Sequence, residues 1–173
     1  MVSLNITEFK FEPSQKQNEF IEHLLSNSFP LYYFSTVNEY KGFCHSFLKK
    51  SEHDSLGIVN SYYWEHIYTL FQEICAKHDI EHKVIYRSSL NVTTFDKNKI
   101  GDFHVDHPFP HKNFIIYLND FSNGSTYIQN EETKELKEIK AEKFKVVIFD
   151  GFMHAQGFCN VGERRVVLVV TFN

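Results

Sequence analysis

The pattern of apolar and polar positions divides the chain into a first part with helical periodicity and a second part with strand periodicity. In segments 14–29 and 60–80, apolar residues recur every three or four positions, which is the spacing of one face of a helix. Ser14 and Ser61 stand at the start of these segments and are candidate helix caps. We therefore predict two amphipathic helices in the first part of the chain.

Short runs of β-branched and aromatic residues, separated by turn-forming residues, make up the second part. They span residues 82–95, 112–120, 125–129, 135–140, 145–150 and 164–173. Helices followed by many short strands favour a mainly β fold with flanking helices: an antiparallel jelly roll, or double-stranded β-helix, of the cupin-like kind. We expect one domain, in which residues 1–81 are mostly helical support and residues 82–173 form the β core.

Composition narrows the class of protein. The chain has 173 residues, of which 42% are apolar and 23% charged, and this is typical of a soluble globular domain. A net charge of −4 does not favour nucleic acid as a partner. The sequence has neither an apolar run long enough for a membrane span nor a signal peptide, so we expect a cytoplasmic protein. The three cysteines form no CxxC pair, which gives little support to a disulfide or a thiolate zinc site.

The densest group of metal-binding side chains lies in the segment DFHVDHPFPHK, residues 102–112. If this segment is extended, His104 and Asp106 point to the same face, because side chains alternate along a strand. His154 follows a strongly apolar run, and a jelly roll brings such distant segments together. Two histidines and one carboxylate are the facial triad of non-haem Fe(II) oxygenases, which leaves coordination positions open.

His107 and His111 offer a rival interpretation. Together with His104 they would make an all-histidine zinc site or a cupin-like site. The two prolines of HPFPHK instead favour a loop that leaves the strand. We therefore expect His107 and His111 to be exposed loop residues at the mouth of the pocket, where they can touch substrate.

Two adjacent arginines, Arg164 and Arg165, begin the apolar run VVLVVTF. A cation at the head of a buried strand is costly unless it meets an anion. A dicarboxylate co-substrate would supply one, and a guanidinium can hold a carboxylate with two parallel hydrogen bonds. Which arginine faces inward depends on a single residue of register.

The order of these motifs resembles the 2-oxoglutarate/Fe(II)-dependent oxygenases, and within them the prolyl-4-hydroxylase-like group. The resemblance covers residues 87–173 and rests on His104-Val-Asp106, the YLND motif, a Gly-Ser-Thr turn, His154 and Arg164. It implies that His104, Asp106 and His154 hold Fe(II). It also implies that Tyr117 and Arg164 bind the distal carboxylate of 2-oxoglutarate, since the Gly-x-Arg spacing of the family favours Arg164 over Arg165.

The activity that the resemblance implies is hydroxylation of an unactivated C–H bond, in a peptidyl proline, another protein side chain or a small molecule. Fe(II), 2-oxoglutarate and O2 are the implied cofactors, with ascorbate as an optional reductant. Two other interpretations remain open at the level of the sequence. One is a cupin-like metal enzyme that does not use 2-oxoglutarate, and the other is a non-enzymatic β-sandwich binding module.

Overall fold

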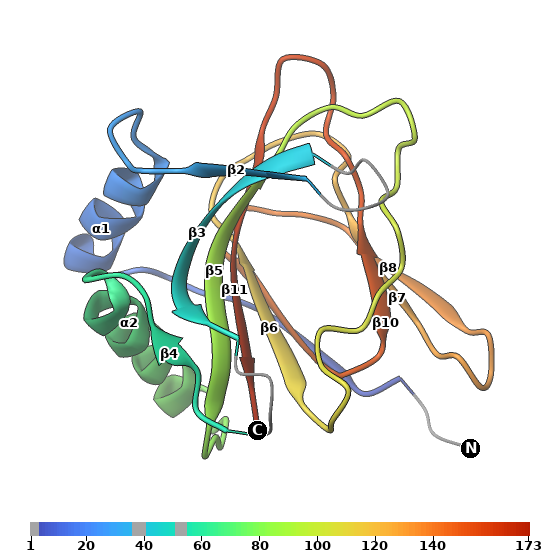
Figure 1. Cartoon of the computed structure of the whole chain (residues 1–173), viewed down its shortest axis with the longest axis horizontal. Coiled ribbons are helices and arrows are strands. Elements are labelled where there is room, and N and C mark those ends of the chain that lie inside the picture. Colours follow the sequence, from blue (N-terminus) through green and yellow to red (C-terminus); the bar gives the residue numbers. More distant parts are fainter. Residues whose placement is uncertain (1–3, 36–40, 51–54) are drawn as a thin grey trace.

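The structure is a computed structural model that describes residues 4–35, 41–50 and 55–173. Strands dominate it, and two helices lie on one side (Figure 1). The elements are β1 (Ile6–Lys10), α1 (Gln15–Leu25), β2 (Tyr32–Ser35), β3 (Lys41–Lys49), β4 (Ile58–Val59), α2 (Trp64–Lys77), β5 (Ile85–Thr93), β6 (Lys112–Tyr117), β7 (Thr126–Gln129), β8 (Leu136–Ile139), β9 (Lys145–Asp150), β10 (Met153–Gln156) and β11 (Arg165–Phe172).

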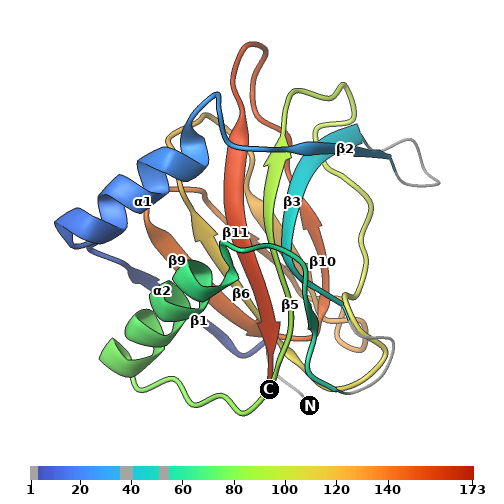
Figure 2. The same cartoon turned by 60° about the vertical axis from the view of Figure 1, so that its left-hand side comes forward.

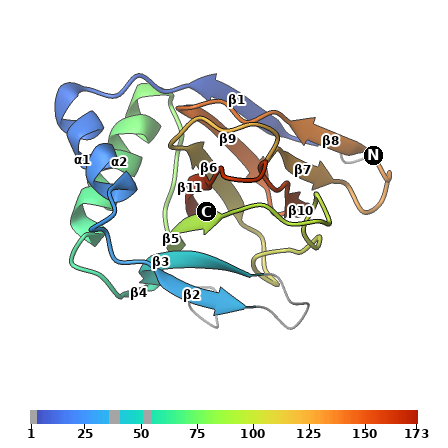
Figure 3. The same ribbon diagram turned by 90° about the horizontal axis from the view of Figure 1, so that it is seen from above.

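The strands form two antiparallel sheets. The larger sheet has the order β1-β9-β6-β11-β5-β3-β2, with β4 paired to β3, and the smaller sheet has the order β10-β7-β8. Seen from above, the smaller sheet lies opposite the larger one, and the helices cover the other face of the larger sheet (Figure 3). This arrangement is the jelly roll that the strand pattern predicts, so the expected fold class is confirmed.

Strand β11 lies in the middle of the larger sheet, between β5 and β6, and all eight of its residues are buried. Its even-numbered apolar residues belong to the core under the helices, and its odd-numbered valines, Val167 and Val169, belong to the core between the sheets. A strand buried on both faces explains why this run is continuously apolar instead of alternating. The face between the sheets is where functional side chains can gather.

Both predicted helices are present, and each buries one face against the larger sheet (Figure 2). Helix α1 begins after Ser14, whose hydroxyl accepts a hydrogen bond from the backbone N–H of Gln17, while the Gln17 side chain accepts one from Ser14 N–H. This capping box confirms Ser14 as the cap. In α2, Phe71 packs edge-on against Phe114 and Phe172 of the sheet, with ring centroids 5.2 and 5.4 Å apart.

The prediction of Ser61 as the cap of the second helix is wrong. Helix α2 begins at Trp64, and its N-cap residue is Tyr63, which makes no side-chain capping bond. The Ser61 hydroxyl instead lies 2.8 Å from Nε2 of the buried His45 and 3.2 Å from the backbone nitrogen of Tyr63. Ser61 therefore shapes the turn before the helix.

The expectation that residues 1–81 are mostly helical is also wrong, because this part contributes four strands to the larger sheet. β1 pairs with β9, and β3 pairs with β5, both across large distances in sequence. Such strands depend on a distant partner and, as in the mixed polar sequence of β1, need not carry an apolar run of their own. Within the described ranges, neither helix combines the length and apolar character that crossing a bilayer requires. The three cysteines are free.

Candidate metal centre

His104, Asp106 and His154 come together between the two sheets. One ligand atom from each residue lies within 4.8 Å of the other two. His154 belongs to β10, while His104 and Asp106 lie on the segment between β5 and β6. His104 and His154 form an isolated antiparallel bridge, in which each backbone N–H donates to the carbonyl of the other at 3.0 and 2.9 Å. This bridge places the two imidazoles side by side.

Both imidazoles are oriented by hydrogen bonds to main-chain carbonyls. Nδ1 of His104 lies 3.1 Å from the carbonyl oxygen of Asp102, and Nδ1 of His154 lies 3.0 Å from that of Phe152. A carbonyl oxygen only accepts, so Nδ1 of each ring carries a proton, and in the neutral ring Nε2 keeps its lone pair. Metal-binding histidines normally donate their other ring N–H to a carbonyl or a carboxylate in this way. Both Nε2 atoms are therefore available as ligands.

Asp106 is held by a cation from the neighbouring strand. Nη1 of Arg87 in β5 lies 2.7 Å from Oδ1 of Asp106, and Oδ2 lies 3.5 Å from Nε2 of His154. Burial alone would raise the pKa of Asp106, but the charge of Arg87, joined in acid by the imidazoles once they are protonated, outweighs burial and holds this pKa well below its usual range. The Lys50 ammonium donates to the main-chain carbonyl of Asp106. The carboxylate is therefore ionised, with Oδ2 turned toward the imidazoles.

The donor set fits a divalent transition metal. Burial lowers the pKa of His154 to about 4, so this imidazole is neutral near pH 7 and needs no deprotonation to bind. Two imidazole nitrogens and one carboxylate oxygen suit Fe(II), and only three positions around the ion would be filled by protein. The structure thus brings together the three residues that the sequence predicts as ligands; their role as ligands remains a prediction.

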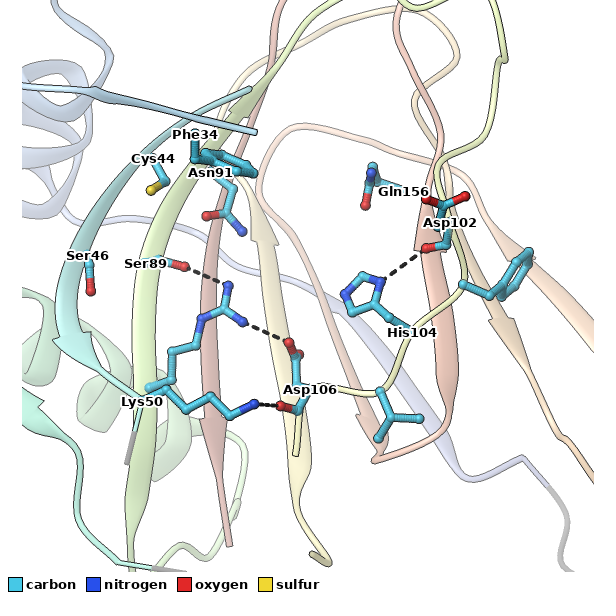
Figure 4. Close-up of a pocket in the computed structure, with 13 residues that line it drawn as sticks. Phe34, Cys44, Ser46, Lys50, Ser89, Asn91, Asp102, His104, Asp106 and Gln156 are labelled. Carbon is cyan, nitrogen blue, oxygen red and sulfur yellow. Dashed lines mark hydrogen bonds and ion pairs between the residues drawn. The ribbon is translucent and has the colours of Figure 1, made fainter. Parts of the chain in front are cut away.

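Two adjoining cavities open on this group. The larger, about 540 Å³, lies between strands β3 and β5 and the segment 102–106 (Figure 4). The smaller, about 60 Å³, lies deeper, between β11 and the segment that includes His154. The residues that line both cavities are Arg87, Asn91, His104, Asp106 and Gln156. The candidate ligands therefore lie between the larger cavity, called the outer cavity below, and the smaller one, called the inner cavity.

Arg165, and not Arg164, lies in the inner cavity. Arg164 is exposed, and its guanidinium donates to the carbonyl of Leu25 at 2.7 Å. Arg165 is only 3% exposed; it donates to the carbonyl of Gly124 at 2.9 Å and to the Thr126 hydroxyl at 3.1 Å. The expectation that Arg164 faces inward is therefore corrected to Arg165.

The physical reason is strand parity. In β11, Arg165 pairs with Thr93 of β5, and Val167 pairs with Tyr117 of β6. Residues directly opposite in a sheet share a face. Arg165 thus points to the face between the sheets with Val167, while Arg164 precedes the strand and points away.

Tyr117 lies next to Arg165, although it does not itself line the inner cavity. The Tyr117 hydroxyl is fully buried and lies 2.6 Å from the Thr126 hydroxyl, which lines the cavity. The Arg165 guanidinium lies 5.5 Å from the centre of the Tyr117 ring. Burial raises the pKa of Tyr117, so the phenol stays protonated and can donate. Arg165, Thr126 and Tyr117 thus form one polar cluster.

The expectation that His107 and His111 are exposed at the pocket mouth is wrong. They are 3% and 6% exposed. His107 is hydrogen-bonded through Nε2 to the Thr171 hydroxyl at 2.7 Å, and Nδ1 of His111 lies 2.8 Å from the carbonyl of Phe109. The proline-rich segment packs against the larger sheet, because the rings of His107 and Phe109 lie 5.5 and 5.0 Å from that of Tyr86 in β5. Within the described residues, the candidate metal group contains neither histidine.

Sequence reasoning did not identify Arg87 or Thr126 as site residues. Arg87 stands in the run IYRSSLNVT, where a single cation inside a buried strand is the same signal that drew attention to Arg164 and Arg165. Thr126 belongs to the Gly-Ser-Thr turn, which carried the resemblance but gave no role to its threonine. The partners of these two residues, Asp106 for Arg87 and Arg165 for Thr126, become known only from the fold.

Comparison with known proteins supports the fold through structure and not through sequence. No family model matches the chain, and a search of curated proteins finds no match. Among solved structures, a 2OG-Fe(II) oxygenase family oxidoreductase from Burkholderia pseudomallei is similar with a TM-score of 0.75 at 12% identity, over 97% of this chain and 85% of that one.

Two further similar structures are enzymes with different activities. A prolyl hydroxylase from Trichoplax adhaerens, in complex with a hypoxia inducible factor peptide fragment, gives a TM-score of 0.64 at 9% identity, over 96% of this chain and 82% of that one. A non-haem α-ketoglutarate-dependent epimerase from nogalamycin biosynthesis gives 0.66 at 8% identity, over 97% and 77%. The chain therefore has the fold of 2-oxoglutarate/Fe(II) oxygenases, and the resemblance seen in the sequence is confirmed at this level.

Proposed function

We propose that the chain is an Fe(II)- and 2-oxoglutarate-dependent oxygenase that hydroxylates an unactivated C–H bond. The observation that carries the proposal is the convergence, between the sheets of an oxygenase-like jelly roll, of His104, Asp106 and His154 with the buried Arg165. A metal triad alone is common to many chemistries. A triad that shares a cavity with a buried cation can also bind an anionic co-substrate beside the metal ion.

Nε2 of His104, Nε2 of His154 and a carboxylate oxygen of Asp106 would hold Fe(II). Bound Fe(II), together with 2-oxoglutarate and O2, supplies an oxidant that converts a C–H bond to C–OH while 2-oxoglutarate becomes succinate and CO2. The protein orients the two imidazoles through Asp102 and Phe152. It also excludes bulk water from Asp106 and His154, which are 6% and 7% exposed.

Arg165 would bind the far carboxylate of 2-oxoglutarate. Its partners in the structure, a carbonyl and a hydroxyl, carry no charge. Among residues 4–35, 41–50 and 55–173, no carboxylate forms an ion pair with it. A buried guanidinium without an anion is costly, and a dicarboxylate would remove that cost while Thr126 and Tyr117 add hydrogen bonds.

The two other interpretations of the sequence have less support. A cupin-like enzyme without 2-oxoglutarate has no use for the buried charge of Arg165. A binding module with incidental histidines does not require both rings to be oriented through Nδ1. A peptidyl proline as substrate is supported only by fold likeness to the Trichoplax enzyme, and one fold can serve several substrates, as the similar epimerase illustrates.

An anaerobic titration of the purified chain with Fe(II) and 2-oxoglutarate tests the proposal. We expect one equivalent of Fe(II) to bind and a weak visible charge-transfer band to develop only when both are present. His104→Ala should abolish the band, whereas His66→Ala, at an exposed position on α2, should leave it unchanged. No band in the wild type, or an unchanged band in His104→Ala, would refute the proposal.

A further inference from the structure

The outer cavity has a volume of about 540 Å³, within the range of small-molecule sites. It opens directly on His104 and Asp106, so under the proposed function it is where a substrate would lie. Figure 4 shows two walls. One wall comes from β3, the residue that follows it and β5, and it carries Cys44, Ser46, Lys50, Ser89 and Asn91. The other wall carries Asp102, His104 and Gln156.

Two cations, Lys50 and Arg87, line this cavity, and together they have one acidic partner. Arg87 pairs with the Asp106 carboxylate at 2.7 Å, and Lys50 donates to the main-chain carbonyl of the same residue. Among the described residues, no other carboxylate forms an ion pair with either cation. Asp106 is also a proposed metal ligand, so its single negative charge would be shared between a metal ion and the two cations.

Both cations keep donors available for a ligand. A guanidinium has five N–H groups and an ammonium has three. Arg87 donates to Asp106 and to the Ser89 hydroxyl, and Lys50 donates to Asp106. Ser46, Ser89 and Asn91 add neutral polar groups along the same wall. Asp102 lies on the opposite wall and forms no ion pair with a described residue, so it does not neutralise Lys50 or Arg87.

We propose that this wall, formed by Lys50 and Arg87 with Ser46 and Ser89, binds an oxyanion of the substrate, a carboxylate or a phosphate. The inference rests on the proposed function, because it takes the outer cavity as the substrate site. An oxyanion bound here would lie against the wall that carries Lys50, and the rest of the substrate would extend toward His104 on the opposite wall. The substrate is then a small acid or an acidic group, and not a neutral peptide segment.

Binding of matched probes to the Co(II)-loaded protein at saturating 2-oxoglutarate tests this wall. Phenylacetate, phenylacetamide and phenyl phosphate share a ring and differ in charge, and their binding is followed by paramagnetic broadening of their proton NMR signals. Saturating 2-oxoglutarate prevents the acids from occupying the Arg165 site. We expect at least one of the two anions to bind at least tenfold more tightly than the amide, and the tighter anion identifies the oxyanion.

Lys50→Gln should remove this preference, because it deletes a cation without touching a proposed metal ligand's side chain. Lys49→Gln is the matched control, since Lys49 is exposed and does not line the cavity. Equal binding of anions and amide, no binding of either anion at millimolar concentration, or a preference that survives in Lys50→Gln would each overturn the inference. The Co(II) absorption spectrum, recorded first, reports loading separately: failure to load with Co(II) or 2-oxoglutarate counts against the proposed function instead.

Discussion

Arg87 and Asp106 form an ion pair of 2.7 Å that ties strand β5 to the segment carrying two of the three candidate ligands. The Asp106 side chain is 5% exposed and the Arg87 side chain 27%, so the carboxylate is buried while its cation reaches the outer cavity. A buried carboxylate needs such a partner to remain ionised. The pair therefore keeps Asp106 charged and fixes which of its oxygens faces the two histidines.

Replacing Arg87 should weaken metal binding. In Arg87→Ala, the largest of the charges that lower the pKa of Asp106 would be gone, so this pKa would rise, and the carboxylate would lose the bond that orients it. We expect the affinity of the chain for Co(II) to fall by about 10- to 100-fold, the usual effect of losing a partner of a metal ligand. Competition titration against a chelator measures this. Arg87→Lys, which keeps the charge, should recover part of the affinity; equal affinities for wild type and Arg87→Ala would show that Asp106 needs no such support.

The adjacent arginines provide a matched pair for the co-substrate. Arg165→Lys keeps the charge but loses the planar fork that holds a carboxylate with two hydrogen bonds, so the Kd for 2-oxoglutarate should rise by about 30-fold, or about 2 kcal/mol. Arg164→Lys should leave that Kd unchanged, because Arg164 is exposed and bonds to Leu25. Titration of the charge-transfer band gives both values. A larger effect at Arg164 than at Arg165 would reverse the assignment.

Under the proposed function, Tyr117 would bind the same carboxylate through its single hydroxyl. Removing it in Tyr117→Phe costs one hydrogen bond, about 1 kcal/mol, so the Kd for 2-oxoglutarate should rise by about fivefold. Tyr127→Phe is the control, because the Tyr127 hydroxyl bonds weakly to Glu138 at 3.4 Å on the exposed side of β7. The same titration serves for both variants. A Tyr117→Phe protein with wild-type affinity would limit Tyr117 to packing.

The sequence predicted the parts of the fold that depend on local pattern. Both helices and the six strands with apolar or β-branched runs were located, because burial on one or two faces leaves a periodic signal. Five strands were not predicted: β1, β2, β3, β4 and β10. Of these, β1 and β3 have partners, β9 and β5, that are distant in sequence. Their pairing is decided by the whole sheet and not by their own residues.

In the site, the sequence predicted which residue types come together but not every side chain's direction. The two histidines and Asp106 could be found because their spacing is itself the signal. Arg164 and Arg165 could not be separated, because one residue of register reverses the face of a strand. The prolines predict an exposed His107 because they indicate a loop, yet a loop can fold inward when its rings pack against a strand, as those of His107 and Phe109 do against Tyr86.

The stability of the metal-free protein should fall between pH 6.5 and pH 4. Burial lowers the pKa of both His107 and His154 to about 4, whereas a histidine in the unfolded chain titrates near its ordinary value of 6.5. Below pH 6.5 the unfolded chain therefore binds protons that the folded protein does not, and unfolding becomes more favourable as the pH falls. Linkage gives a slope of up to about 1.4 kcal/mol per pH unit for each histidine.

Urea unfolding of the metal-free chain at pH 7.5, 6.0 and 5.0 measures this slope. His107→Gln should reduce the slope by about half, because one of the two imidazoles with a lowered pKa is gone while a side-chain amide can still bond to the Thr171 hydroxyl. His66→Gln, at an exposed position, should leave the slope unchanged. Equal unfolding free energies at pH 7.5 and 5.0 would mean that both imidazoles take up protons in the folded state. Burial would then not explain why the His154 imidazole is neutral near pH 7, as metal binding through Nε2 requires.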